Sequence, residues 1–112
     1  MSYHHQRLAE SGWHQLSLTE QLANVGSEFS RAFRAKKDAK PARFMPAFER
    51  LAELLNLTLS DPRWPLGRKR EIARLKENIF THLYSETPDL AAIAPLERYF
   101  YYFGVARQAG RT

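Results

Sequence analysis

Cysteine is absent from the 112 residues of this chain, which excludes disulfide frameworks, thiol nucleophiles and cysteine-ligated metal sites. Long apolar runs are absent as well. Residues 87–96 carry a single charge, but this stretch contains Pro88 and Pro95 and is too short to span a bilayer. Residues 1–10 are polar and lack the apolar core of a signal peptide. We therefore expect a soluble cytoplasmic protein without a membrane segment.

Acidic residues are few relative to basic ones. Twelve Asp and Glu stand against seventeen Lys and Arg, so the formal net charge is +5. This balance favours a polyanionic partner, RNA or DNA, bound through its phosphate backbone. The composition, 44% hydrophobic and 26% charged, is that of a globular chain, and the length fits one domain.

Strand-like alternation is also missing, and the apolar residues recur instead at helical spacing. Ser17 and Glu20 fit a capping box, which predicts that the first helix starts there. The helix is expected to end at about Lys37, because Pro41 disfavours helical geometry in the residue before it. Its apolar stripe comprises Leu18, Leu22, Val25, Phe29, Ala32 and Phe33.

The second helix is expected to open at Pro41 or at Pro46, since either proline fits a first helical turn. Residues 61–67, with two prolines and a glycine, predict a turn that no helix crosses intact. The apolar stripes on either side of this turn are Phe44, Phe48, Leu51, Leu55 and Leu59 before it, and Ile72, Leu75, Ile79 and Leu83 after it.

The third helix is predicted to stop around residues 84–86. The last helix either starts at the cap-like segment 87–89 and bends at Pro95, or starts at Pro95, and it ends near Gln108. These patterns predict an all-α, four-helix bundle, up-down-up-down, with short connections. The expected organisation is a polar N-terminal arm over residues 1–16, the bundle domain over 17–108 and a tail over 109–112.

Twelve of the seventeen basic residues fall in two segments, 31–43 and 63–76. The first lies mainly at a helix C-terminus, where the macrodipole favours cations, whereas the second occupies the first turns of a helix, where the dipole repels them. The second segment therefore predicts an anion site. The simpler alternative is that these charges form a solvated face that keeps the protein soluble. The residues predicted to contact nucleic-acid phosphates are Arg63, Arg68, Lys69, Arg70 and Arg74, with Arg34, Lys36 and Lys37 from the first segment.

Five aromatic residues follow one another at 99–103. Consecutive residues on a helix are turned by about 100° each, so they cannot all face one core. We expect Tyr99, Tyr101 and Tyr102 to form an interface with a second copy or a partner protein. Two alternatives are that the tyrosines cover the N-terminal arm, which includes Trp13, or that they stack on bases.

Residues that carry catalysis are scarce. Arg74, Asn78 and His82 form one polar stripe on the third helix, but seven residues separate Arg74 from His82. Helical ribonucleases of the HEPN type have four to six residues between their arginine and histidine, so this stripe departs from their pattern. No Glu-x-x-His pair, phosphate-binding glycine loop or nucleophile elbow is present. We predict a protein that is not an enzyme, with no catalytic residue, no metal site and no cofactor.

Residues 16–28, LSLTEQLANVGSE, resemble a family of small, uncharacterised, all-helical bacterial proteins. Segments 54–62, 71–75 and 99–107 extend this resemblance over most of the chain. It implies a helical fold and supplies no catalytic residue. By architecture alone, the chain is also similar to small basic four-helix proteins of the ribosomal intervening-sequence type. Those include accessory subunits of reverse transcriptases, which oligomerise and bind nucleic acid.

The basic segments favour a non-catalytic, nucleic-acid-associated helical accessory protein, expected to be oligomeric. The alternative is a protein-interaction or scaffold module, in which the aromatic last helix docks a partner or a second copy. A helical nuclease acting through His82 is a third and weaker hypothesis, because of the spacing around that histidine.

Overall fold

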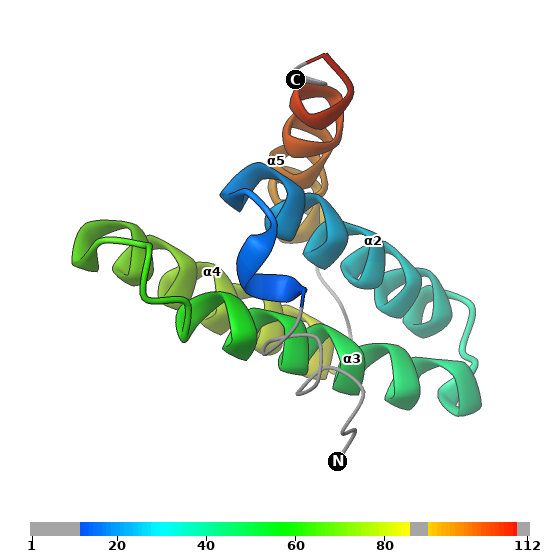
Figure 1. Cartoon of the computed structure of the whole chain (residues 1–112). Coiled ribbons are helices and arrows are strands. Elements are labelled where there is room, and N and C mark those ends of the chain that lie inside the picture. The colour runs from blue at the N-terminus through cyan, green and yellow to red at the C-terminus, as the bar shows by residue number, and fades with distance from the viewer. Residues whose placement is uncertain (1–11, 86–89, 110–112) are drawn as a thin grey trace.

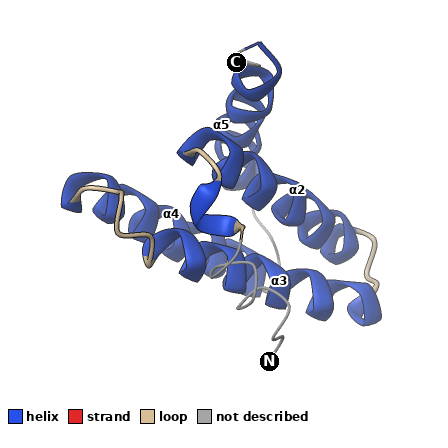
Figure 2. Ribbon diagram, in the orientation of Figure 1, coloured by secondary structure: helices blue, strands red, loops and turns tan. Residues whose placement is uncertain are grey.

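The computed structural model describes residues 12–85 and 90–109, and within these ranges it contains helices and no strand (Figure 2). The prediction of an all-α, four-helix bundle is confirmed. A short 3-10 turn precedes the helices. The elements are η1 (Trp13–Gln15), α2 (Leu18–Lys37), α3 (Pro41–Leu59), α4 (Leu66–Tyr84) and α5 (Leu90–Ala109).

Helix α2 begins at the predicted capping box. The Ser17 hydroxyl accepts a hydrogen bond from the Glu20 amide at 3.1 Å, and the Ser17 amide donates to the Glu20 carboxylate at 2.9 Å. Two amides that have no partner within the helix are satisfied in this way. The helix ends at Lys37, as its sequence predicts.

Prolines start or enter the other helices. Helix α3 starts at Pro41, and Pro46 lies inside it, so the first of the two predicted starts holds. Proline at the first helical position costs no hydrogen bond, whereas Pro46 removes one. Helix α5 is helical on both sides of Pro95 and therefore starts before it. The predicted cap at 87–89 and the predicted tail beyond residue 109 lie outside the described residues.

The predicted turn at 61–67 is two residues too long, because Leu66 and Gly67 already belong to the first turn of α4. Pro65 precedes them in extended geometry, with φ −70° and ψ 163°, and starts the helix. The residue before a helix commonly has such geometry. The turn proper is therefore residues 60–65.

Helix α2 lies at the centre of the arrangement (Figure 1). It forms an antiparallel hairpin with α3, and α4 returns along α3 in the opposite direction. Helix α5 crosses α2 instead of lying along α4, so α2 packs against all three other helices. The α2–α3 turn and the α3–α4 turn are at opposite ends of the molecule.

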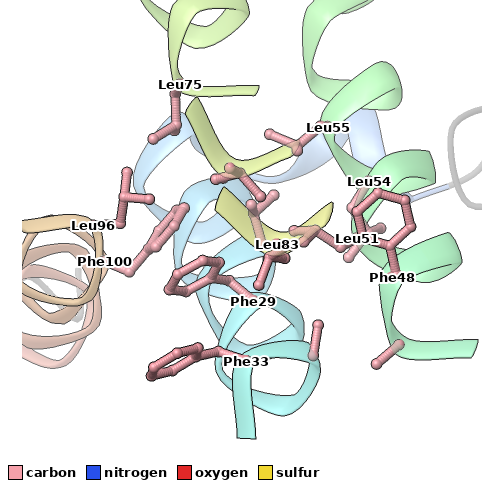
Figure 3. Packing of buried hydrophobic residues seen from close by; sticks show 14 of the residues in the cluster. Phe29, Phe33, Phe48, Leu51, Leu54, Leu55, Leu75, Leu83, Leu96 and Phe100 are labelled. Carbon is pink, nitrogen blue, oxygen red and sulfur yellow. The ribbon is translucent and has the colours of Figure 1, made fainter. Parts of the chain in front are cut away.

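One apolar core joins the four helices (Figure 3). Phe29 of α2 meets Phe100 of α5, with ring centroids 5.4 Å apart. The predicted stripes of the first three helices supply most of the rest of this core, and α5 adds Ile93 and Leu96. Its fully buried apolar side chains are Leu22, Val25, Phe29, Ala32, Leu51, Leu55, Ile72, Ile79, Leu83 and Ile93.

The described part of the predicted polar arm, residues 12–16, packs on the bundle. Trp13 is 3% exposed, and its indole Nε1 donates to the Thr58 hydroxyl at 3.3 Å. Trp13, which lies in the predicted polar arm, thus packs against α3, where its buried indole has a polar partner. Among the described residues, none of the helices is apolar over a length that would cross a bilayer.

Candidate nucleic-acid interface

The two basic segments lie at the two turns that Figure 1 places at opposite ends of α3. Residues 31–43 surround the α2–α3 turn, and residues 63–76 surround the α3–α4 turn and the start of α4. The two segments are therefore separated along the length of α3. The two segments differ in how their cations are arranged.

A groove of about 440 Å³ runs between the C-terminal half of α2 and the N-terminal half of α3. Its size falls within the range of small-molecule sites, about 300–1,000 Å³. Small apolar residues form part of its wall: Ala35, Ala42, Pro46 and Ala47. Five cations and one carboxylate complete the lining: Arg31, Arg34, Lys40, Arg43, Arg50 and Asp38.

The turn between the helices brings these cations together. Ala39 adopts left-handed geometry with φ 54°, and the Lys40 amide donates to the Ala35 carbonyl at 2.8 Å. This bond and the one from Ala39 to Lys36 close α2 as a Schellman turn. The chain reverses within three residues, so side chains of α3 face those at the end of α2.

Buried Glu28 neutralises two of the five cations. Its carboxylate accepts from Arg31 at 2.8 Å and from Arg50 at 2.9 Å, which ties α2 to α3 at one end of the groove. No carboxylate among the described residues lies within ion-pairing distance of Arg34, Lys40 or Arg43. These three cations therefore remain available to an anion.

Of the first segment's predicted contacts, only Arg34 lines the groove. The Lys36 ammonium lies over the ring of Phe44, 5.2 Å from its centroid, and the Lys37 ammonium lies over the ring of Phe33 at 5.5 Å. The sequence prediction did not choose the four other cations of the groove. Their spacing of three to seven residues along each helix is the signal, because such residues share one helix face. They are Arg31, Lys40, Arg43 and Arg50.

In the second segment, Arg63 is held by the protein itself. Its guanidinium donates through Nε and Nη2 to the carboxylate of fully buried Asp61, at 3.0 and 2.6 Å. Nη2 also donates to the Leu16 carbonyl, and the guanidinium stacks on the Trp64 ring at 4.4 Å. The prediction of Arg63 as a phosphate contact missed this role, because the ion pair forms only when the turn folds.

Asp61 is further bonded to the side-chain amide of Gln21, which is also fully buried. Hydrogen bonds from the Arg63 side chain hold the pKa of Asp61 well below its usual range, although burial acts in the opposite direction. Gln21 also donates to the Trp13 carbonyl and accepts from the Trp64 indole. The cluster joins η1, α2 and the α3–α4 turn.

At the start of α4, Arg68 pairs with Glu71 at 3.0 Å. Within the described ranges, no carboxylate pairs with Lys69, Arg70 or Arg74, and the first turn of the helix contains no acidic residue. Four of the predicted phosphate contacts, Arg68, Lys69, Arg70 and Arg74, thus lie in the N-terminal half of α4. The Glu71 carboxylate partly neutralises the first of them. Their side chains project from a single helix, and none of them lines the groove between α2 and α3.

The five aromatic residues at 99–103 differ in exposure, because they point in different directions around α5. Phe100 is buried, while Tyr101 and Tyr102 are 68% and 69% exposed. Tyr99 is half-buried and packs edge-on against Phe103 at 5.0 Å. Burial raises the pKa of the Tyr99 hydroxyl, with a smaller contribution from the charge of a glutamate on α4. Two of the three predicted interface tyrosines therefore face solvent.

Trp13, the arm residue named in the first alternative for the tyrosines, packs on α3, and residues 1–11 of the arm lie outside the described residues. Base stacking by the tyrosines stays a prediction. Tyr101 lines a second groove of about 490 Å³ between α2 and α5. Small residues from α2 form its base, and Glu97 and Arg98 lie at its edge. This groove is distinct from the basic one and carries little net charge.

The polar stripe of Arg74, Asn78 and His82 lies on one helix, and its first two members are exposed. Over residues 12–85 and 90–109, no three metal-ligating side chains converge on one point. No family model matches the chain, and neither a curated protein nor a solved structure resembles it.

Proposed function

We propose that the protein is a non-catalytic, nucleic-acid-associated accessory protein that binds the phosphate backbone. The observation that carries this proposal is the groove between α2 and α3, where Arg34, Lys40 and Arg43 face a cavity without a carboxylate partner of their own. The start of α4, with Lys69 and Arg70, is the second point of contact.

The groove suits phosphate for three physical reasons. Guanidinium groups present paired donors that match phosphate oxygens, and cations gathered from two helices raise the local potential more than the same charges spread along one. Ion pairs with Glu28 fix Arg31 and Arg50 in place, so less side-chain entropy is lost when an anion enters.

The test removes three charges from the groove. Arg34→Gln, Lys40→Gln and Arg43→Gln in one chain are expected to weaken binding to a labelled oligonucleotide at least about 10-fold and to lower the salt slope by about two to three units. Fluorescence anisotropy between about 50 and 200 mM salt measures both. The matched variant, with Lys69, Arg70 and Arg74 changed to Gln, loses the same charge and is expected to lose less affinity.

Equal losses in the two triple variants would mean that only total charge matters, and would remove the groove from the proposal. If the unmodified protein has no affinity for oligonucleotides at low salt, the proposed function is wrong. Circular dichroism of each variant checks that its helices are intact.

A protein-interaction or scaffold module is the second candidate. It is favoured by the exposure of Tyr101 and Tyr102 on α5, beside the groove between α2 and α5. Exposed tyrosines bury large areas at low entropy cost when a partner or a second copy covers them. The two functions are compatible, because the basic groove and the groove beside the tyrosines share no lining residue.

A further inference from the structure

We infer that the groove between α2 and α3 admits an unpaired nucleobase, so that the protein prefers single-stranded nucleic acid to a duplex. This inference rests on the proposed function and specifies its substrate. It follows from the wall of the groove, whose composition differs from that of an ordinary phosphate site.

Part of the wall is apolar. Ala35 and Ala47 are buried, and Ala42 and Pro46 lie beside them on α3. None of these side chains has a donor for a phosphate oxygen. A planar base is apolar on both faces, and single-strand binding proteins commonly bury such faces against apolar or aromatic side chains.

The cations lie around this wall. Arg34 comes from α2 and Arg43 from α3, and both line the same cavity as the alanines. An arginine plane can stack on a base or form a forked contact with a phosphate, so these residues suit the two parts of one nucleotide. Lys40, at the turn, adds a flexible point charge for the neighbouring phosphate.

The shape of the cavity excludes a duplex from its interior. In a duplex the bases are stacked and paired, so a protein meets the phosphate backbone and the base edges in the grooves but not the flat faces of the bases. A duplex therefore contacts the cations from outside and leaves the apolar wall bare. A single strand turns one base into the 440 Å³ cavity and gains that contact as well.

The experiment fills the cavity without changing charge. Ala42 is exposed near the start of α3, so Ala42→Leu adds volume to the wall and leaves the core intact. Anisotropy is measured with a single strand of about 15 nucleotides and with a duplex of equal length, a size that covers one binding site. The control is Ala73→Leu, the same change at an exposed position on α4.

Ala42→Leu is expected to weaken single-strand binding by about 5- to 150-fold, the range for the loss of one stacked base, and to leave duplex binding within about 2-fold. The control is expected to change neither. Equal affinity of the unmodified protein for the two probes, or equal losses in Ala42→Leu, would overturn the inference and leave the proposed function standing. Absence of binding to both probes would instead contradict the proposed function.

Discussion

The ion pair with Asp61 limits which other groups the Arg63 guanidinium can bind. The carboxylate occupies two of the three guanidinium nitrogens of Arg63, and one of these also donates to the Leu16 carbonyl. An arginine held in this way has one nitrogen left for an external phosphate. Its main effect is to fix the turn between α3 and α4, where neighbouring cations project into solvent.

Asp61→Asn tests this structural role. The substitution keeps the shape of the side chain but leaves Arg63 without its buried partner. Removing one member of a buried ion pair typically costs 3–5 kcal/mol, and we expect about 3 kcal/mol because Arg63 retains access to water. Urea denaturation measures the loss. Glu77→Gln, on the exposed face of α4, is the control and is expected to stay within about 0.5 kcal/mol.

The same pair predicts a pH dependence with a definite sign. Because the pKa of Asp61 is lower in the folded chain than in the unfolded chain, its stabilisation is complete above about pH 4 and is lost as the pH falls further. The difference in unfolding free energy between the protein and Asp61→Asn should therefore shrink below about pH 4. A difference that is constant down to acid pH would contradict the role assigned to this carboxylate.

Helices α2 and α5 approach each other closely at Gly26, and the lack of a side chain there permits it. A Cβ at position 26 would lie 2.7 Å from the Cβ of Phe100, closer than two carbon atoms tolerate. Glycine inside a helix costs about 0.5–1 kcal/mol relative to alanine. The core contact between Phe100 and Phe29 thus requires a residue that is otherwise unfavourable for α2.

Gly26→Ala is expected to destabilise the fold by about 1–2 kcal/mol, because the overlap with Phe100 exceeds the gain in helix propensity. Gly104→Ala, in α5, meets no atom within 4 Å and is expected to stabilise the fold by up to about 1 kcal/mol. Urea midpoints of the two variants measure these opposite effects. A stabilising Gly26→Ala would mean that α2 and α5 do not approach as closely as described.

The starts of α2 and α3 could be predicted because they depend on signals from neighbouring residues in the sequence. The capping box at Ser17 and the proline at position 41 act through backbone groups within one turn, so they are visible in the sequence. The positions of Pro46 and Pro95 within their helices were harder to predict, because a proline can either start a helix or lie inside one. Only the packing of apolar residues on both sides determines which occurs.

Over the whole molecule, positive charge is concentrated at the two ends of α3. Its 19 residues span about 28 Å at 1.5 Å per residue, so one copy carries two separate basic clusters. Helix α5, which carries the exposed tyrosines, crosses α2 away from the α2–α3 turn (Figure 1). Association through α5 would thus leave the basic groove open in every copy.

Replacing Tyr101 and Tyr102 together with alanine tests that association. If copies associate through α5, the protein's mass should rise with concentration, and the double variant should remain monomeric, because most of the area of these side chains faces solvent in one copy. Light scattering over a concentration series measures the mass. The control is Leu66→Ala, another largely exposed apolar side chain, on α4. A protein that is monomeric at all concentrations would contradict association through this face.

The order of helices, their main boundaries and most of the core follow from the sequence by itself, because capping, proline geometry and apolar periodicity act over a few neighbouring residues. Which cations are free was decided only by the tertiary structure. Arg63 is bound by Asp61 within a turn that Gln21 and Trp13 complete from far along the chain. The basic groove likewise exists only once α2 and α3 face each other, since a cavity and its ion pairs depend on distances between segments that are not neighbours in sequence.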